Sequence, residues 1–270
     1  MRADIERYRV APGSGVALDG FQTREGDPAA KADIKAATSV LQKKAAGLLD
    51  MLYARRKHAI LVVLQAMDAA GKDSTIRRCF GPLNPQRVKT TAFRQPNRHE
   101  RRHDFLWRIH QHAPARGTIG VFNRSHYEAV LIEKVKDLAP GDVLEKRYEH
   151  INDFEQMLVD EGTLVLKFYL HVSKAYQKKR LERRLRRPDK QWKFSRNDIP
   201  EREHWREYMD AYEVALGRCS TKNAPWYIVP SERRWYRDFV IVEALVQCLE
   251  SLDLSYPQPE LDVGSITIPD

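Results

Sequence analysis

Residues 59–76 read AILVVLQAMDAAGKDSTI, and this stretch determines the expected fold. The run from Ile60 to Leu64 is apolar and rich in β-branched residues, which is typical of a short buried strand. A turn of small residues follows, and after Lys72 the sequence can continue as a helix. Strand, small-residue turn, Gly-Lys and helix together describe a phosphate-binding loop, in which backbone N–H groups and a helix N-terminus face an anion.

The loop departs from the general pattern G-x-x-x-x-G-K-[ST] at two positions. Ala66 stands where the first glycine is expected, and Asp73 stands where a metal-binding hydroxyl is expected. Asp68 lies inside the loop. A carboxylate there is compatible with phosphate when a divalent cation lies between them, so Asp68 is the candidate ligand for Mg²⁺ or Mn²⁺. Lys72 is expected to contact the phosphates that flank the transferred group. Further phosphate or nucleotide contacts are expected from Ala69, Ala70, Gly71, Asp73 and Ser74. The alternative is an ordinary strand-to-helix turn with a solvated lysine.

Length and composition indicate one large α/β domain. The chain has 270 residues, of which 42% are apolar. We expect a single domain over residues 1–270, with residues 1–31 as an N-terminal arm. The sequence has no uninterrupted apolar run of about 18 residues, and MRADIERYRV lacks the apolar core of a signal peptide. Three widely spaced cysteines outside any CxxC pattern indicate reduced thiols. These features predict a cytoplasmic protein without membrane association.

The positive charge is concentrated in one segment. The net charge is +9, and residues 174–206 hold 13 Lys/Arg against 5 Asp/Glu, a net +8. A segment with such an excess of positive charge predicts an anionic partner such as nucleic acid, acidic lipid or polyphosphate. Helical spacing places one row of cations on a single face: Lys179, Arg180, Arg183, Arg184 and Arg187. A solvated helix face is the alternative interpretation.

Strand and helix patterns alternate along the chain. Strands are expected at residues 60–64, 88–93, 117–123, 163–171 and 226–229. Helices are expected at residues 32–58, 74–79, 98–113, 142–161, 174–187, 200–217 and 234–252, with Ser173 capping the basic helix. Such alternation produces a parallel sheet covered on both faces. The predicted architecture is therefore a three-layer α/β/α P-loop kinase fold, with residues 174–206 as a basic lid.

Polar residues follow two of the predicted strands. Arg94 comes after the second strand and Arg124 after the third, at the sheet edge where ligands bind in open α/β folds. Guanidinium groups can clamp phosphoryl oxygens, so both arginines are expected to point into the same cleft as Lys72. Asn123 and Glu128 are candidates for nucleotide, phosphate or metal contacts. Either arginine could instead pair with a local carboxylate such as Glu128.

The residues alone leave two classes of function open. Trp192 and Phe194 alternate with cations in KQWKFSR, a pattern that also suits single-stranded nucleic acid. One hypothesis is a phosphotransferase whose lid grips a phosphate chain, and the other is a nucleic-acid-binding P-loop protein. The arginines expected in the cleft favour the phosphotransferase.

Four motifs in this order resemble the family-2 polyphosphate kinases. They are MDAAGKD, HDFLWRIH, FNRSHYE and RRLRRPDKQWKFS, and the resemblance covers about residues 41–252. It implies a thymidylate-kinase-like fold with a helical lid. It also implies Mg²⁺-dependent phosphoryl transfer between inorganic polyphosphate and nucleotides (AMP, ADP and ATP), and assembly as a homodimer or homotetramer. Nucleic acid is then not the expected partner.

The resemblance assigns roles residue by residue. Asp68 resembles the family's loop aspartate, which contacts metal and acceptor phosphate; Lys72 matches the loop lysine and Arg124 the arginine of the second motif. Arg180, Arg183 and Arg184 match the lid cations that hold the chain. The second motif departs from the commoner form D-R-S-W-Y-N, since Asn123 replaces the aspartate and Glu128 the asparagine. The form present here resembles the third subgroup, which accepts both AMP and ADP. An ADP-only polyphosphate kinase is the alternative within the family, and an ATP-dependent nucleotide kinase is the alternative outside it.

Overall fold

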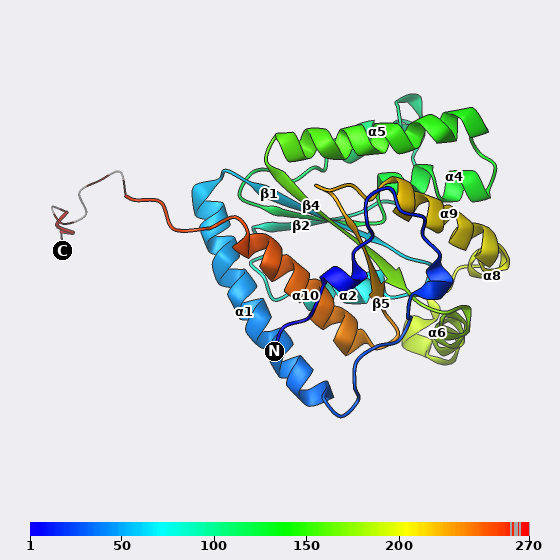
Figure 1. The fold of residues 1–270 in the computed structure, drawn as a ribbon, viewed down its shortest axis with the longest axis horizontal. Helices are drawn as coiled ribbons and strands as arrows, with labels where there is room; N and C mark the ends of the chain where they lie inside the picture. The colour runs from blue at the N-terminus through cyan, green and yellow to red at the C-terminus, as the bar shows by residue number, and fades with distance from the viewer. Residues whose placement is uncertain (260, 262–263, 265, 270) are drawn as a thin grey trace.

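The protein forms one parallel five-stranded sheet with helices on both faces (Figure 1). The computed structural model describes residues 1–259, 261, 264 and 266–269. The strands are β1 (Ala59–Gln65), β2 (Val88–Ala92), β3 (Ile119–Asn123), β4 (Thr163–His171) and β5 (Trp226–Pro230). Their order in the sheet is β2-β3-β1-β4-β5, and every pairing is parallel. The predicted α/β architecture is therefore confirmed.

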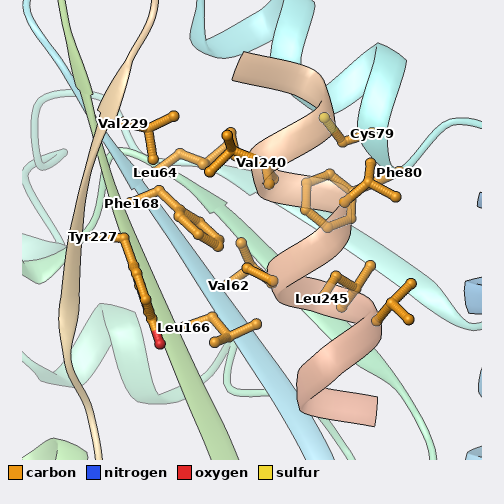
Figure 2. Packing of buried hydrophobic residues seen from close by; sticks show 14 of the residues in the cluster. Val62, Leu64, Cys79, Phe80, Leu166, Phe168, Tyr227, Val229, Val240 and Leu245 are labelled. Atoms are coloured by element: carbon orange, nitrogen blue, oxygen red, sulfur yellow. The ribbon is translucent and has the colours of Figure 1, made fainter. Parts of the chain in front are cut away.

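The central strand explains the layering. All seven residues of β1 are buried, as expected for a parallel strand covered on both faces. Successive side chains alternate between the faces, so Val62 packs into one core while Val63 packs into the other. On the first face lie α1 (Lys31–Arg55), α2 (Lys72–Cys79) and α10 (Arg234–Glu250), and Figure 2 shows Val62 and Phe168 packed beneath α10. On the second face lie α5 (Gly141–Asp160) and α9 (Trp205–Arg218).

The lid segment is helical, and its first helix is capped as predicted. It consists of α6 (Lys174–Arg186), α7 (Pro188–Gln191) and α8 (Asp198–Glu203). Ser173 Oγ accepts a hydrogen bond from Tyr176 N at 3.1 Å, which satisfies one backbone donor of the first turn. The helix expected at 200–217 is interrupted at His204, so that α8 and α9 are separate elements.

The amphipathic helix predicted for residues 98–113 is wrong. The segment contains only the 3₁₀ turn η3 (Glu100–Arg102) and the short helix α3 (Trp107–His110). Two polar side chains explain this result. The side chain of Asn97 accepts from His99 N and Glu100 N, and that of Asp104 accepts from Leu106 N and Trp107 N. Such local bonds start new turns and compete with a continuous helix.

The N-terminal arm packs against the body of the protein. It includes η1 (Glu6–Tyr8) and η2 (Leu18–Gly20). Val10 N donates to Trp226 O at 2.8 Å, which attaches the arm to β5. Tyr8 and Leu18 are buried in the two cores. Past α10, residues 251–259 extend away from the sheet without forming a helix or strand (Figure 1). In the described part of the chain, no helix is both long and apolar enough to cross a membrane.

Candidate active site at the phosphate loop

The carboxyl ends of β1 and β3 bring together three of the predicted site residues. Arg124, just after β3, donates from Nη2 to Asp68 Oδ1 at 2.7 Å and from Nη1 to Glu128 Oε2 at 3.0 Å. The two strands are neighbours in the sheet, so residues 56 positions apart meet at its edge. The Asp68 and Arg124 side chains are each 35% exposed, which leaves both accessible to a ligand.

The charged side chains at this edge of the sheet shift the pKa values of their neighbours. Burial opposes ionisation of the Asp68 carboxyl, but the positive charges of Arg124 and Lys72 outweigh it and hold the pKa below its usual value. Burial, reinforced by the charge of Arg124, lowers the pKa of Lys72 to about 8. The Lys72 ammonium donates from Nζ to Ala66 O at 2.6 Å, so the side chain folds back along the loop. These are the perturbed charges expected of a functional site.

The loop backbone needs small residues at two positions. Ala69 and Gly71 have φ values of 63° and 116°, in the left-handed region. Gly71 O accepts from Ser74 Oγ at 2.8 Å, and the Ala70 N–H donates to Met67 O at 3.2 Å. The Ala70 amide and the Ser74 hydroxyl, both predicted phosphate contacts, are therefore bonded within the loop here.

A buried network supports the turn that carries Arg124. Arg124 itself has φ = 62°, a strained conformation for a residue with a side chain. Tyr127, in the same turn, donates from Oη to Glu155 Oε1 at 2.9 Å and accepts from Lys167 Nζ at 2.9 Å. His126 Nε2 lies 3.1 Å from Glu155 Oε1, and Lys167 forms an ion pair with Glu155. The network links the turn to α5 and β4.

Sequence reasoning missed this network because its members are distant in the chain. Glu155 lies on α5 and Lys167 on β4, and both side chains are no more than 1% exposed. The available signal was the lysine in the middle of the apolar run TLVLKFYLH. A charge in a central strand needs a buried partner.

The lid touches the phosphate loop at two points. Gln177 Nε2 on α6 donates to Asp68 O at 3.0 Å. Lys193, after α7, lies 3.2 Å from Asp73 Oδ2. Asp73 also accepts a hydrogen bond from Asn123 Nδ2 at 3.0 Å. The Asp73 carboxylate therefore connects Lys193 of the lid with Asn123 at the end of β3. Gln177 and Lys193 were not among the predicted site residues.

The predicted lid cations occupy different environments. Arg180 and Arg184 are half-buried, whereas Lys179 and Arg183 are exposed. Burial lowers the pKa of Arg180, and the positive charges of Arg234, Arg183 and Arg184 add to this effect, although Tyr176 opposes it. The charge of Arg184 reaches Asp68 and helps to hold its pKa down. Arg187 forms two hydrogen bonds with Asp189, at 3.0 and 2.8 Å.

Arg94 forms no hydrogen bond or ion pair with this cluster among the described residues, and its role in phosphate binding stays a prediction. Its side chain is exposed, and its backbone oxygen accepts from Arg108 Nη2 at 2.6 Å. Arg94 follows the edge strand β2, and β3 lies between β2 and β1, so Arg94 follows a strand one place further from β1 than the strand before Arg124.

A narrow cleft adjoins Asp68 and Arg124. It is lined by Ala66, Met67, Asp68, Arg124, Glu128, Leu131, Gln177, Glu201, Tyr208 and Tyr212. Tyr208 and Tyr212 come from α9, which sequence reasoning did not connect to the site. A separate hollow of about 1070 Å³ lies between residues 103–111 and α5, and it contains no predicted site residue.

The candidate ligands for a divalent cation at this edge of the sheet are Asp68 and Asp73, which do not form a preassembled metal site. Among the described residues, no group of three His, Cys, Asp or Glu side chains could hold a metal ion. Asp68 and Asp73 offer carboxylates that are 35% and 70% exposed. Mg²⁺ commonly uses one or two protein carboxylates and completes its shell with phosphate and water. This donor set therefore fits a cation held together with a phosphate ligand.

A parallel α/β sheet, a phosphate loop and a cationic lid define a phosphate-binding protein of the P-loop kinase class. The family model described as "Polyphosphate kinase 2 (PPK2)" matches residues 29–257. The chain belongs to this family.

Individual relatives are similar over almost the whole chain. An "AMP/ADP-polyphosphate phosphotransferase" of Meiothermus ruber is 45% identical over 98% of this chain and 100% of its own. An "ADP-polyphosphate phosphotransferase" of Rhodopseudomonas palustris is 39% identical over 96% of this chain and 94% of its own. The crystal structure of a polyphosphate kinase 2 from Arthrobacter aurescens TC1 superimposes with a TM-score of 0.92 at 42% identity, covering 96% of this chain and 93% of that one.

Proposed function

We propose that this protein transfers phosphoryl groups from inorganic polyphosphate to AMP and to ADP, reversibly, with Mg²⁺ as the cofactor and Mn²⁺ as a substitute. The observation that carries this proposal is the Asp68–Arg124–Lys72 cluster, which lies next to a lid helix that carries the half-buried cations Arg180 and Arg184. Membership of the polyphosphate kinase 2 family supports the donor, and the name of the Meiothermus ruber relative supports the two acceptors.

Each residue has a defined part in the transfer. Arg124 holds the acceptor phosphate in the cleft beside Asp68, and Lys72 neutralises charge on the transferred group. The chain runs along the lid cations toward the loop. The acceptor is already an anionic phosphate oxygen, so positioning and charge neutralisation suffice and no strong base is needed. A cation held by Asp68 would supply further positive charge to the phosphates.

The organisation of the chain also belongs to this proposal. We infer one kinase domain over residues 1–270, with residues 1–31 as its arm and 174–206 as its lid. We infer also that the protein is cytoplasmic and assembles as a homodimer or homotetramer. Gel filtration with light scattering measures the assembly directly; a monomer contradicts that part.

The decisive experiment supplies AMP or ADP with Mg²⁺ and either long-chain polyphosphate or ATP, and separates the nucleotides by chromatography. ADP and ATP formed from AMP and polyphosphate alone are the expected products. ATP formed only from ADP would keep the family and reject AMP as an acceptor. Transfer from ATP but not from polyphosphate would indicate an ordinary nucleotide kinase instead.

A further inference from the structure

A buried arginine lies directly behind the phosphate loop. Arg237, in the first turns of α10, is 0% exposed. Its Nε and Nη2 donate to Asp238 Oδ1 at 3.0 and 2.5 Å, and Nη2 lies 3.4 Å from Ser74 Oγ. Its Nη1 is buried and has no hydrogen-bond acceptor among the described residues.

The unpaired nitrogen faces the loop glycine. A Cβ added at Gly71 would lie 2.7 Å from Arg237 Nη1, which is a steric conflict. Gly71 is thus required twice, by its φ of 116° and by the close approach of this guanidinium. Arg237 therefore sits against the turn from which Lys72 begins α2.

The charges around Arg237 do not balance. Asp238 also accepts from Arg78 Nη1 at 3.1 Å, so two guanidinium groups share one carboxylate. The Arg78 side chain is 46% exposed, so solvent screens its charge, and the positive charge that lies against the loop is that of Arg237. Because Asp238 is shared, it neutralises the buried guanidinium of Arg237 only in part, and an anion bound at the loop would offset the remaining cost of burial.

We propose that Arg237 is a positioning residue for the phosphate chain. It fixes the backbone of Gly71 and adds a positive charge beneath the loop, without itself touching the substrate. The ligand it favours is a condensed phosphate, whose linked groups carry a high charge density; the inference rests on the proposed function for that choice of ligand. A purely structural role, joining α10 to α2, is the alternative.

Binding of tripolyphosphate without nucleotide tests this role independently of catalysis. Isothermal calorimetry compares the wild-type protein with Arg237→Gln and Arg237→Lys. The glutamine variant is expected to bind about tenfold or more weakly, because a buried charge is lost. The lysine variant, which keeps a charge but not the fork of the guanidinium, is expected to bind several-fold more weakly. AMP affinity is expected to be unchanged in both variants.

Arg78→Gln is the matched control. Arg78 contacts the same Asp238, but its side chain is 46% exposed, so this change tests the α2–α10 junction rather than the loop. Its tripolyphosphate affinity is expected to stay within twofold of wild type. Wild-type affinity in a folded Arg237→Gln protein, or equal weakening in the Arg78 control, would overturn the proposal. If the glutamine variant does not fold, wild-type affinity in Arg237→Lys overturns it. Failure of the wild-type protein to bind tripolyphosphate would overturn this inference, whereas failure to use long-chain polyphosphate as a donor would overturn the proposed function.

Discussion

The ammonium group of Lys72 loses its proton at a lower pH than an ordinary lysine does. Burial and Arg124 lower its pKa to about 8, so part of the population is neutral in mildly alkaline solution. The unfolded chain holds this proton up to about pH 10.5. Between these values the unfolded state binds more protons, and this group makes the free protein more stable as pH rises. A bound phosphate favours the charged form, so binding above pH 8 takes up a proton.

The first prediction concerns this titration. For the wild-type protein, kcat/KM for polyphosphate is expected to fall above about pH 8, because free protein loses the Lys72 charge. Arg does not titrate in this range, so Lys72→Arg is expected to show lower activity but no such fall. A pH–rate profile from about pH 6.5 to 9.5 makes the measurement. An identical fall in both proteins would assign the titration to another group.

The second prediction concerns the carboxylate of Asp68. Asp68→Ala removes the carboxylate that pairs with Arg124 and offers a cation ligand, so kcat is expected to fall by about 10³-fold or more. The fold should persist, since the side chain is 35% exposed and Arg124 keeps Glu128. Asp210→Ala, an exposed carboxylate on α9, is the control. Full turnover in folded Asp68→Ala protein would contradict the assigned role.

At the scale of elements, α6 separates into an inward and an outward face. The buried Gln177 and Leu181 show which face packs on the body. Arg180 and Arg184 are half-buried beside it, and the charge of Arg184 reaches Asp68. Arg186 is on the outside, 78% exposed and paired with Glu182. If this helix holds a chain of phosphates, we therefore expect binding to depend on Arg180 and Arg184 more than on Arg186.

This division leads to the third prediction. Arg180→Ala and Arg184→Ala are each expected to raise KM for polyphosphate about tenfold, with a smaller change in kcat and in KM for the nucleotide. Arg186→Ala removes the same kind of side chain from the outer face and is expected to change KM less than twofold. Steady-state kinetics at varied polyphosphate and fixed AMP distinguish these cases. A change in KM for the nucleotide alone would contradict the assignment of polyphosphate binding to the lid.

At the scale of the whole molecule, the N-terminal arm is attached to the helix α10 by side-chain contacts. Arg2 Nη1 lies 2.6 Å from Glu243, whose side chain is 0% exposed, and Nη2 lies 3.0 Å from Glu250. Tyr8 and Tyr236 share a hydrogen bond of 2.9 Å. The helix that these contacts stabilise also carries Arg237 behind the phosphate loop.

The fourth prediction concerns stability. Arg2→Ala leaves the buried Glu243 with Gln247 as its one hydrogen-bond donor among the described residues, and is expected to lower the free energy of unfolding by about 1–3 kcal/mol. Arg7→Ala removes an arginine of similar exposure whose partner Glu25 also bonds to Tyr8, so about 0.5 kcal/mol or less is expected. Urea unfolding measures both. Equal losses would show that the arm contributes through general charge rather than through Glu243.

The sequence by itself determined the elements and their class. The β1 run, the capping Ser173 and the alternation of strands and helices are local patterns, and local burial and hydrogen bonding act on neighbouring residues. The concentration of cations in residues 174–206 was also visible, as was the resemblance that identified the family. The division of 98–113 into turns was not predicted, because Asn97 and Asp104 bond to their own backbone.

The tertiary structure decided which of these residues meet. Arg124 reaches Asp68 because β3 lies beside β1, whereas Arg94 follows β2, which lies one strand further from β1. The pairing of Glu155 with Lys167 and the position of Arg237 behind Gly71 depend on how helices pack on the sheet. Contacts between distant segments follow from strand order and packing, and a local pattern carries no information about either.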